Sequence, residues 1–329
     1  MSAAFSEYIK IIGKGQKGSR SLTRDEAFTA MQMVLDGDVT GEQRGAFLML
    51  LRTREETPDE IIGFLDACRA RVNTVVRALP VVVDIGCYAG KRRQLPWYLL
   101  AAACLAGQGT KVFMHGAHEP GSGRLYASLA LPALGLAPVT NVQDASRQLQ
   151  QQHATYLDLS HVLPPLNEII KLREVFGLRS CANTLGRLLN PSAAPCSIQG
   201  VFHTHLDDKH GKVNQAYTQY AALCFRGDGG DPEINSERET TLFITRDGLT
   251  STAVVPASDS GWALKDKQMD VADMLAYWRG DSTHKYAAQA VIATLASYIM
   301  LIENCDYTHA CARATDMWQN RKKHTLPFA

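Results

Sequence analysis

The feature that most constrains the fold is an alternation of short apolar segments with helical ones, which begins near residue 81. Five segments are largely apolar and β-prone: VVVDIG (81–86), KVFMHG (111–116), TYLDLS (155–160), SIQGVF (197–202) and ALCFRG (222–227). Helical segments such as WYLLAAACLAG, RLYASLALPALG and PLNEIIKLREVFG lie between them. Buried strands that alternate with helices are typical of a parallel sheet covered by helices on both faces. The sequence therefore predicts an α/β fold with a mainly parallel sheet, then two more strands (240–255) and three helical stretches to about Gln319.

The first eighty residues show helical periodicity instead. Thr23 to Glu26 and Thr57 to Glu60 fit capping boxes, in which the two side chains bond the first free N–H groups of a helix. A third helix is expected in EQRGAFLMLLR, after the turn DGDVTG. We therefore predict two domains, a small helical one over residues 1–80 and a larger α/β one over residues 81–329.

Composition narrows the functional classes. The formal net charge is only +1, so a case for a polyanionic partner rests on local clusters. Eight cysteines are scattered without a C-x-x-C pair, as expected of reduced thiols. The N-terminal segment lacks the apolar core of a signal peptide, and the longest apolar runs are too short to cross a bilayer. We expect a cytoplasmic protein with no membrane partner.

The loop GCYAGKRRQ joins the first predicted strand to a helix, which is where α/β proteins hold phosphate on a helix N-terminus. It carries three consecutive cations, Lys91, Arg92 and Arg93. A Walker A loop is excluded, because Gly86 and Gly90 have the wrong spacing and Arg92 replaces the required Ser or Thr. Two interpretations remain open, an ordinary solvated loop or a loop whose side chains contact phosphates.

Two further segments carry candidate chemistry. The segment GKGQKGSR contains Lys14 and Lys17, with Arg20 at its end, and is either a phosphate-following basic loop or a mobile, solubilising N-terminus. The segment FHTHLDDKH, after the fourth predicted strand, resembles a metal site. This segment leaves open a third interpretation of the chain, as a metal-dependent hydrolase centred on His203 and His205.

The order of several segments resembles the anthranilate phosphoribosyltransferase (TrpD) family. The resemblance runs through the helical segment LTRDEAFTAMQMVLDGDVTGEQRGAFLMLLRTREETPDEIIGFLDACR, through VVDIG and VFMHG, and through LREVFGLRSCANTLGRLLNP. The last stretch is similar to the long family block R-x-x-L-G-x-R-T-x-F-N-L-L-G-P-L-x-N-P, and the whole likeness spans roughly residues 5–320. It implies an anthranilate phosphoribosyltransferase-like fold and a homodimer built through the helical domain.

The same resemblance implies where a substrate site lies and how far it departs from the family. The family's G-T-G-G-D pyrophosphate loop corresponds to GCYAG, with Gly86 and Gly90 left, and its K-H-G-N-R motif to MHGAH, with His115 and Gly116 left. The magnesium-binding D-G-L-D-E motif becomes DGGDPE, with Asp231 and Glu233 as weak candidate ligands. Losing one donor to a transition-state phosphate costs a few kcal/mol, so these losses predict a degenerate phosphoribosyltransferase site.

A subgroup of the family, the YbiB-type paralogues, keeps the fold without the catalytic loops and binds nucleic acid, and the chain resembles it in its basic segments. The predicted function is therefore that of a homodimer that binds nucleic acid with little sequence preference and without a cofactor. The predicted partner is single- or double-stranded DNA, with RNA as a further candidate. Tyr88 and Trp97 are candidates for stacking on bases. The predicted phosphate contacts are Lys14, Lys17, Arg20, Lys91, Arg92, Arg93, Arg173 and Arg187.

The alternative function is a phosphoribosyltransferase that uses phosphoribosyl pyrophosphate with an altered acceptor. It would keep Arg173, at the position that faces anthranilate in the family, for a carboxylate-bearing acceptor. Asp231 and Glu233 would then bind Mg²⁺, and Lys91 and Arg92 would replace the lost backbone cradle with charge.

Overall fold

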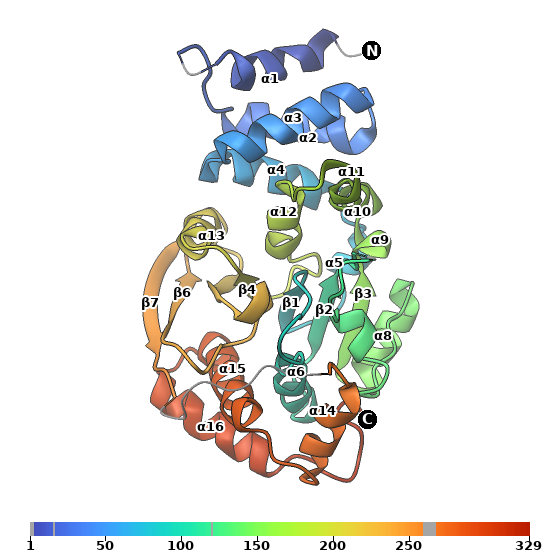
Figure 1. The fold of residues 1–329 in the computed structure, drawn as a ribbon, viewed down its shortest axis with the longest axis vertical. Coiled ribbons are helices and arrows are strands. Elements are labelled where there is room, and N and C mark those ends of the chain that lie inside the picture. The colour runs from blue at the N-terminus through green and yellow to red at the C-terminus, as the bar shows by residue number, and fades with distance from the viewer. Residues whose placement is uncertain (1–2, 16, 120, 259–267) are drawn as a thin grey trace.

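The computed structural model describes residues 3–15, 17–119, 121–258 and 268–329, and its centre is one seven-stranded sheet (Figure 1). The strand order is β3-β2-β1-β4-β5-β6-β7. The strands are β1 (Val83–Cys87), β2 (Val112–Gly116), β3 (Ala154–Asp158), β4 (Cys196–Val201), β5 (Ala221–Arg226), β6 (Thr240–Arg246) and β7 (Leu249–Val255). The first five pair in parallel, and β6 and β7 are antiparallel. The predicted mainly parallel sheet is confirmed.

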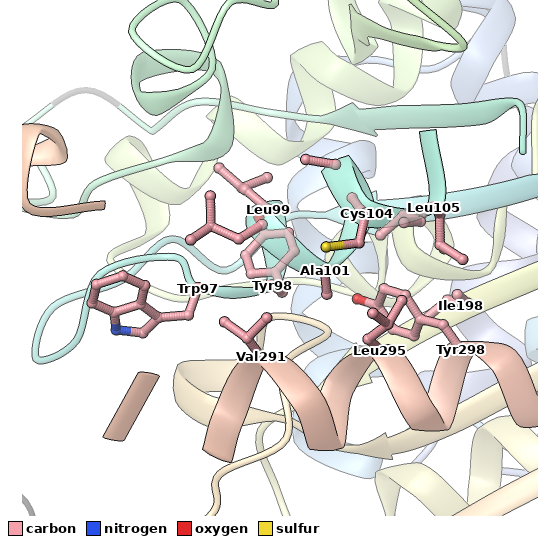
Figure 2. Packing of buried hydrophobic residues seen from close by; sticks show 14 of the residues in the cluster. Trp97, Tyr98, Leu99, Ala101, Cys104, Leu105, Ile198, Val291, Leu295 and Tyr298 are labelled. Carbon is pink, nitrogen blue, oxygen red and sulfur yellow. The ribbon is translucent and has the colours of Figure 1, made fainter. Parts of the chain in front are cut away.

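Helices cover both faces of the sheet, as the apolar strands require. On one face α6 (Tyr98–Gly107) packs against the long α15 (Lys285–Glu303), with Ala101 facing Val291 and Leu295 (Figure 2). On the other face lie α12 (Ala182–Leu188) and α13 (Leu206–Asn214). The strands β1, β2 and β4 are buried along their whole length, whereas the edge strand β7 leaves several residues exposed. Burial on both faces explains why the parallel strands lack a polar alternation.

The N-terminal helices form a layer at one end of the molecule (Figure 1). They are α1 (Ala3–Gly13), α2 (Arg24–Asp36), α3 (Gly41–Arg54) and α4 (Pro58–Arg71). The short α5 (Thr74–Arg77) follows them in the sequence and lies at the level of the sheet (Figure 1). Both predicted capping boxes are present, at Thr23 and Thr57, and a third is present at Thr40. The sequence did not predict α1, which is anchored by Phe5 and Ile12. The division near residue 80 stays a prediction, because one apolar cluster joins these helices to the α/β part.

The remaining helices are α7 (Ala127–Ala130), α8 (Val142–Gln151), α9 (Leu159–Val162), α10 (Pro164–Lys171), α11 (Arg173–Phe176), α14 (Val271–Arg279) and α16 (Tyr307–Gln319). The helix expected in RLYASLALPALG is only the single turn α7, since Pro132 and the left-handed Gly135 (φ 94°) follow it. The helix α15 is long and apolar enough to cross a membrane, but 72% of its most apolar 18-residue stretch is buried inside the protein. It packs against α6 and α16, so it is a core helix.

Candidate active site

A pocket of about 530 Å³ opens at the carboxyl ends of the strands, next to β1, β4 and β5. The strand order reverses its direction of growth between β1 and β4, and α/β proteins bind ligands at that switch point. The loop after β1 and the loop after β2 form one wall, and the segments after β4 and β5 form the other. We call this the arginine pocket, because its lining includes Arg92, Arg93, Arg124, Arg226 and Arg238.

The arginine pocket carries a large excess of positive charge. Among the ion pairs formed by the described residues, none uses these five guanidinium groups, and Asp228 is the one carboxylate among the described residues of the lining. Burial, together with the nearby Arg179 and Arg92, lowers the pKa of Arg124, and burial with Arg226 lowers that of Arg238. Neighbouring guanidinium groups that form no ion pair suit a phosphorylated ligand.

Backbone contacts hold the arginine-bearing loops together. Lys91 N–H donates to Leu125 O and Leu125 N–H to Lys91 O, both at 2.9 Å, which pairs the loop after β1 with the loop after β2. Arg124 Nη1 donates to the carbonyl oxygens of Ala89 and Gly90, each at 3.0 Å, and Arg92 Nη2 to Ser122 O at 2.9 Å. Two loops that are distant in sequence therefore present their arginines from one fixed wall.

The expected glycine loop is folded inward. Gly86 lies at the end of β1 under the backbone of Arg187, and Gly90 has the left-handed conformation (φ 68°) that glycine adopts readily. The N–H groups of Ala89 and Gly90, which a phosphate would need, donate instead to Asp231 Oδ1 at 3.0 and 3.3 Å. The backbone cradle for one pyrophosphate is therefore bonded to the protein's own carboxylate.

His115 belongs to a buried network beside this loop. Its Nδ1 lies 2.8 Å from Tyr88 Oη and its Nε2 lies 3.0 Å from Asp84 Oδ1. Gly116 permits the close approach of β1 and β2, since a Cβ there would lie 2.2 Å from Cys87 O. Neither His115 nor Tyr88 lines the arginine pocket.

Lys91 points away from solvent and is only 1% exposed. Its ammonium lies 2.7 Å from Asp228 Oδ2 and 2.6 Å from Glu233 Oε1. Burial alone would lower the pKa of Lys91, but Glu233, Asp228 and Asp231 together outweigh burial and raise it, so the ammonium stays charged. Glu233 Oε2 also accepts the Tyr98 N–H at 2.9 Å, and so Glu233 occupies the N-terminus of α6. The anion site expected at this helix is filled by a side chain.

The other predicted phosphate contacts are spread over the molecule. Lys14, Lys17 and Arg20 are in the segment between α1 and α2, where Arg20 pairs with Glu26 at 2.6 Å. Arg187 is buried, donates to Gly200 O at 3.0 Å and Asn183 O at 2.6 Å, and has its pKa lowered to about 10 by burial and by Arg179. Of the eight predicted contacts, the structure brings Arg92 and Arg93 to the arginine pocket.

Arg173 lies at a second, smaller pocket of about 280 Å³, the side pocket, which includes Glu119, Ser122 and Ile170. Its guanidinium forms an ion pair with Glu119 Oε2, and Arg179 lies 3.5 Å from the same oxygen. Glu119 Oε1 is buried and has no hydrogen-bond partner among the described residues. The side pocket adjoins the arginine pocket through Ser122, whose carbonyl binds Arg92.

The histidine segment does not form a metal site. His203 and His205 are exposed, while His210 is buried in α13 and lies 3.1 Å from Gln199 Oε1. Across residues 3–15, 17–119, 121–258 and 268–329, one group of three potential ligands has its atoms within 4.8 Å of one another, and it is Glu303, Cys305 and His309. The interpretation as a metal-dependent hydrolase centred on His203 and His205 is therefore not supported by the geometry.

Sequence reasoning missed Arg124, Arg226, Arg238 and the partner of Lys91, Asp228. The sequence did contain a signal for them, because each lies at the end of a predicted strand or in the segment after one. The carboxyl ends of parallel strands meet at one edge of the sheet, which is where α/β proteins bind ligands. Arg226, for example, is the last residue of β5.

Family models match both parts of the chain. A helical bundle domain of a glycosyl transferase family matches residues 6–72, and an a/b domain of a glycosyl transferase family matches residues 96–320. The chain belongs to this glycosyl transferase family. The predicted resemblance to anthranilate phosphoribosyltransferases is thereby confirmed at the level of the family and fold, whereas the YbiB-type subgroup is not.

Curated relatives agree on one activity. An anthranilate phosphoribosyltransferase of Anaeromyxobacter sp. (strain K) is 31% identical over 246 residues, which is 74% of this chain and 72% of that protein. One of Methylobacterium nodulans is 29% identical over 265 residues, 79% of this chain and 76% of that protein. The prediction that nucleic-acid binding is the function is therefore wrong. The structure supplies a reason, because Lys91, Arg187, Tyr88 and Trp97 are buried and do not reach a nucleic acid.

Solved structures confirm the fold. The anthranilate phosphoribosyltransferase of Thermus thermophilus has a TM-score of 0.77 at 20% identity, with 94% of each chain covered. The Saccharomyces cerevisiae enzyme in complex with PRPP and Mg has a TM-score of 0.76 at 17% identity, covering 97% of this chain and 94% of that one. In the present chain the residues at the expected magnesium position do not fit a divalent cation, because the Lys91 ammonium lies between Asp228 and Glu233, and Asp231 binds backbone N–H groups.

Proposed function

We propose that the protein is a phosphoribosyltransferase that takes phosphoribosyl pyrophosphate in the arginine pocket and transfers its phosphoribosyl group to an acceptor other than anthranilate. The observation that carries the proposal is the set of five arginines at the switch point of the sheet, which form no ion pair with any described residue. A volume of about 530 Å³ is within the usual range of small-molecule sites. The curated relatives, which are anthranilate phosphoribosyltransferases, support the same activity.

The reaction breaks the bond between the anomeric carbon of ribose and the pyrophosphate oxygen, and it forms a bond from that carbon to the acceptor. Negative charge develops on the departing pyrophosphate, and fixed cations stabilise such charge most where water is excluded. Arg226 and Arg238 project from the β5 side and Arg92, Arg93 and Arg124 from the other wall. The arginines therefore surround the leaving group. Their positive charges take the place of the backbone N–H groups that a glycine-rich loop would direct at the pyrophosphate.

Isothermal titration of phosphoribosyl pyrophosphate into the purified protein tests this proposal. Replacing Arg226 by Gln removes one cation from the pocket, and a lost hydrogen bond to a charged group costs about 1.5–3 kcal/mol, or roughly a 10- to 150-fold higher Kd. The matched control is Arg279→Gln, an exposed arginine at the end of α14 outside the pocket lining, which should leave Kd unchanged. No heat from the wild type, with or without Mg²⁺, would exclude the proposed substrate.

The side pocket supports an acceptor that differs from anthranilate. Glu119 already pairs with Arg173 and Arg179, so an acceptor carboxylate would have to displace it. Glu119 Oε1, which has no partner among the described residues, instead favours an acceptor that donates an N–H hydrogen bond. We therefore propose that the acceptor is an uncharged amine or nitrogen heterocycle.

A panel of aromatic amines, assayed by pyrophosphate release, tests the acceptor. The wild type should prefer amines without a carboxylate. Glu119→Gln should shift the preference toward anthranilate by at least about tenfold, because one released ion pair at Arg173 is worth about 1.4 kcal/mol or more. Equal use of anthranilate and its carboxylate-free analogue by the wild type would contradict this acceptor class.

A proposal for the oligomeric state and the location rests on the same family resemblance. We propose a cytoplasmic homodimer that forms through the helical layer α1–α4, as the family resemblance implies. Sedimentation equilibrium at micromolar concentration should give twice the 36.1 kDa chain mass, and a single-chain mass would contradict the dimer. Cell fractionation tests the location.

A further inference from the structure

The cluster of Lys91 with Asp228 and Glu233 suggests how this site manages without a metal ion. The lysine comes from the loop after β1, and the two carboxylates come from the segment after β5. Its ammonium lies within 2.7 Å of one oxygen of each carboxylate. A positive group placed between two carboxylates on the floor of a phosphate pocket stands where a divalent cation would be expected to bind.

The remaining oxygens of these carboxylates are also committed. Glu233 Oε2 accepts the Tyr98 N–H at 2.9 Å, and Asp228 Oδ1 accepts a bond from Asn235 Nδ2 at 3.1 Å. Glu233 Oε1, which already contacts Lys91, also accepts a bond from Tyr286 Oη at 3.0 Å. Mg²⁺ demands near-octahedral oxygen ligands at about 2.0–2.1 Å, and Ca²⁺ needs about six to eight. A metal ion would have to expel the buried ammonium and break these bonds, because both cations cannot share the same oxygens.

We propose that the Lys91 ammonium is a built-in cation that replaces the divalent metal ion of this site, so that the protein binds its phosphorylated ligand without a metal. The part of this inference that concerns the ligand rests on the proposed function, and the part that concerns metal exclusion does not. Lys91 is a positioning residue: it is buried, holds the segment Asp228 to Glu233 against the loop after β1, and leaves the phosphates to the arginines.

The distribution of cations agrees with this division of roles. Two of the three residues in the Lys91-Arg92-Arg93 triplet are exposed and line the pocket, and the first is buried beneath them. Arginine keeps its charge at any accessible pH and binds phosphate oxygens in a bidentate fork, so it suits the exposed role. Lysine is a compact point charge, and so it suits the space between two carboxylates.

The first measurement uses Mn²⁺ alone as a probe, followed by electron paramagnetic resonance in the absence of any substrate. Wild-type protein should bind no Mn²⁺ at this site at millimolar concentration. Lys91→Ala should gain a site, with a Kd at least tenfold tighter than any in the wild type, which Asp228→Asn in the same background removes. The matched control, Lys10→Ala, removes an exposed lysine from its pair with Glu7 and should gain no site.

The second measurement needs no variant. The Kd of wild-type protein for phosphoribosyl pyrophosphate, measured by calorimetry in EDTA and in excess Mg²⁺, should differ by less than about threefold, since neither carboxylate of the cluster is free to bind the metal ion. Binding that requires Mg²⁺, or wild-type Mn²⁺ binding that Asp228→Asn abolishes, would overturn the inference. If Lys91→Ala gains Mn²⁺ but the wild type binds no phosphoribosyl pyrophosphate in either buffer, the proposed substrate fails while the role of Lys91 stands.

Discussion

The buried cluster around Lys91 can be tested by a double-mutant cycle of Lys91→Met and Glu233→Gln. Both substitutions keep the approximate shape of the side chain while removing its charge. Lys91→Met leaves Glu233 buried without its counter-charge, and Glu233→Gln leaves Lys91 with Asp228 as its remaining close partner. The prediction concerns the coupling energy, that is, how far the effects of the two substitutions on the free energy of unfolding depart from additivity.

The expected magnitudes follow from the burial of the pair. Removing one partner of a buried ion pair costs about 3–5 kcal/mol, whereas replacing both by neutral groups is often close to neutral. We expect about 3 kcal/mol or more for Lys91→Met and less for Glu233→Gln, because Asp228 is still within 2.7 Å of the ammonium. The double variant should be no less stable than Lys91→Met, which gives a coupling energy at least as large as the cost of Glu233→Gln alone.

Equilibrium urea unfolding, followed by far-UV circular dichroism and by tryptophan fluorescence, measures these free energies of unfolding. The control cycle, Lys10→Met with Glu7→Gln, removes a pair that is exposed on both sides and should leave the urea midpoint unchanged. Strict additivity of the Lys91 and Glu233 effects would refute the reasoning, because it would mean that the two charges do not depend on each other in the folded protein.

Two further predictions concern the loop after β5 and the effect of pH. A Cβ at Gly227 would lie 1.7 Å from the Asp231 carbonyl oxygen, so Gly227→Ala should displace the carboxylate segment, lower the urea midpoint and weaken phosphoribosyl pyrophosphate binding in calorimetry, while Gly107→Ala, which meets open space, should do neither. Burial lowers the pKa of His210 from 6.5 to about 3, so its contribution to stability is complete above pH 6.5 and is lost at about 1.4 kcal/mol per pH unit as the pH falls toward 3. Urea unfolding from pH 7 to pH 5 should show this loss in the wild type, about 2 kcal/mol, and His210→Gln should flatten it; an unchanged slope in the variant would contradict the assignment.

The α/β fold could be predicted because its signals are local. The five parallel strands are continuous apolar runs, and the threonine capping boxes mark the first residues of α2 and α4. Errors arose where a local pattern was weak or interrupted. The helix α1 has few buried anchors, and the stretch that contains α7 ends after one turn at Pro132.

The candidate site could be predicted only in part, because its geometry depends on contacts between distant segments. The triplet Lys91-Arg92-Arg93 is visible in the sequence, but the direction of each side chain is not. Lys91 turns inward because Asp228 and Glu233 lie beneath it, about 140 residues later in the chain. The contribution of Arg226 and Arg238 to the pocket likewise becomes apparent only when β5 is placed next to β4 in the sheet.

The basic residues of the loop after β1 led to the prediction of nucleic-acid binding. Their arrangement in the structure, with arginines lining a pocket and a lysine buried beneath them, favours a small ligand instead. A groove for a polymer needs cations that extend along a surface, since each phosphate is met in turn. Here five arginines converge from opposite walls on a pocket of about 530 Å³, while the next cation inward is bound to two carboxylates. Arginines that converge on one pocket suit a single compact polyanion, such as a pyrophosphate that gains negative charge as it leaves. Because the lysine beneath them is neutralised by two carboxylates, the unpaired positive charge is confined to the arginines that would surround this leaving group. The loop after β1 thus has two roles that its sequence does not separate: its lysine bonds the two carboxylates beneath the pocket, and its arginines line the pocket.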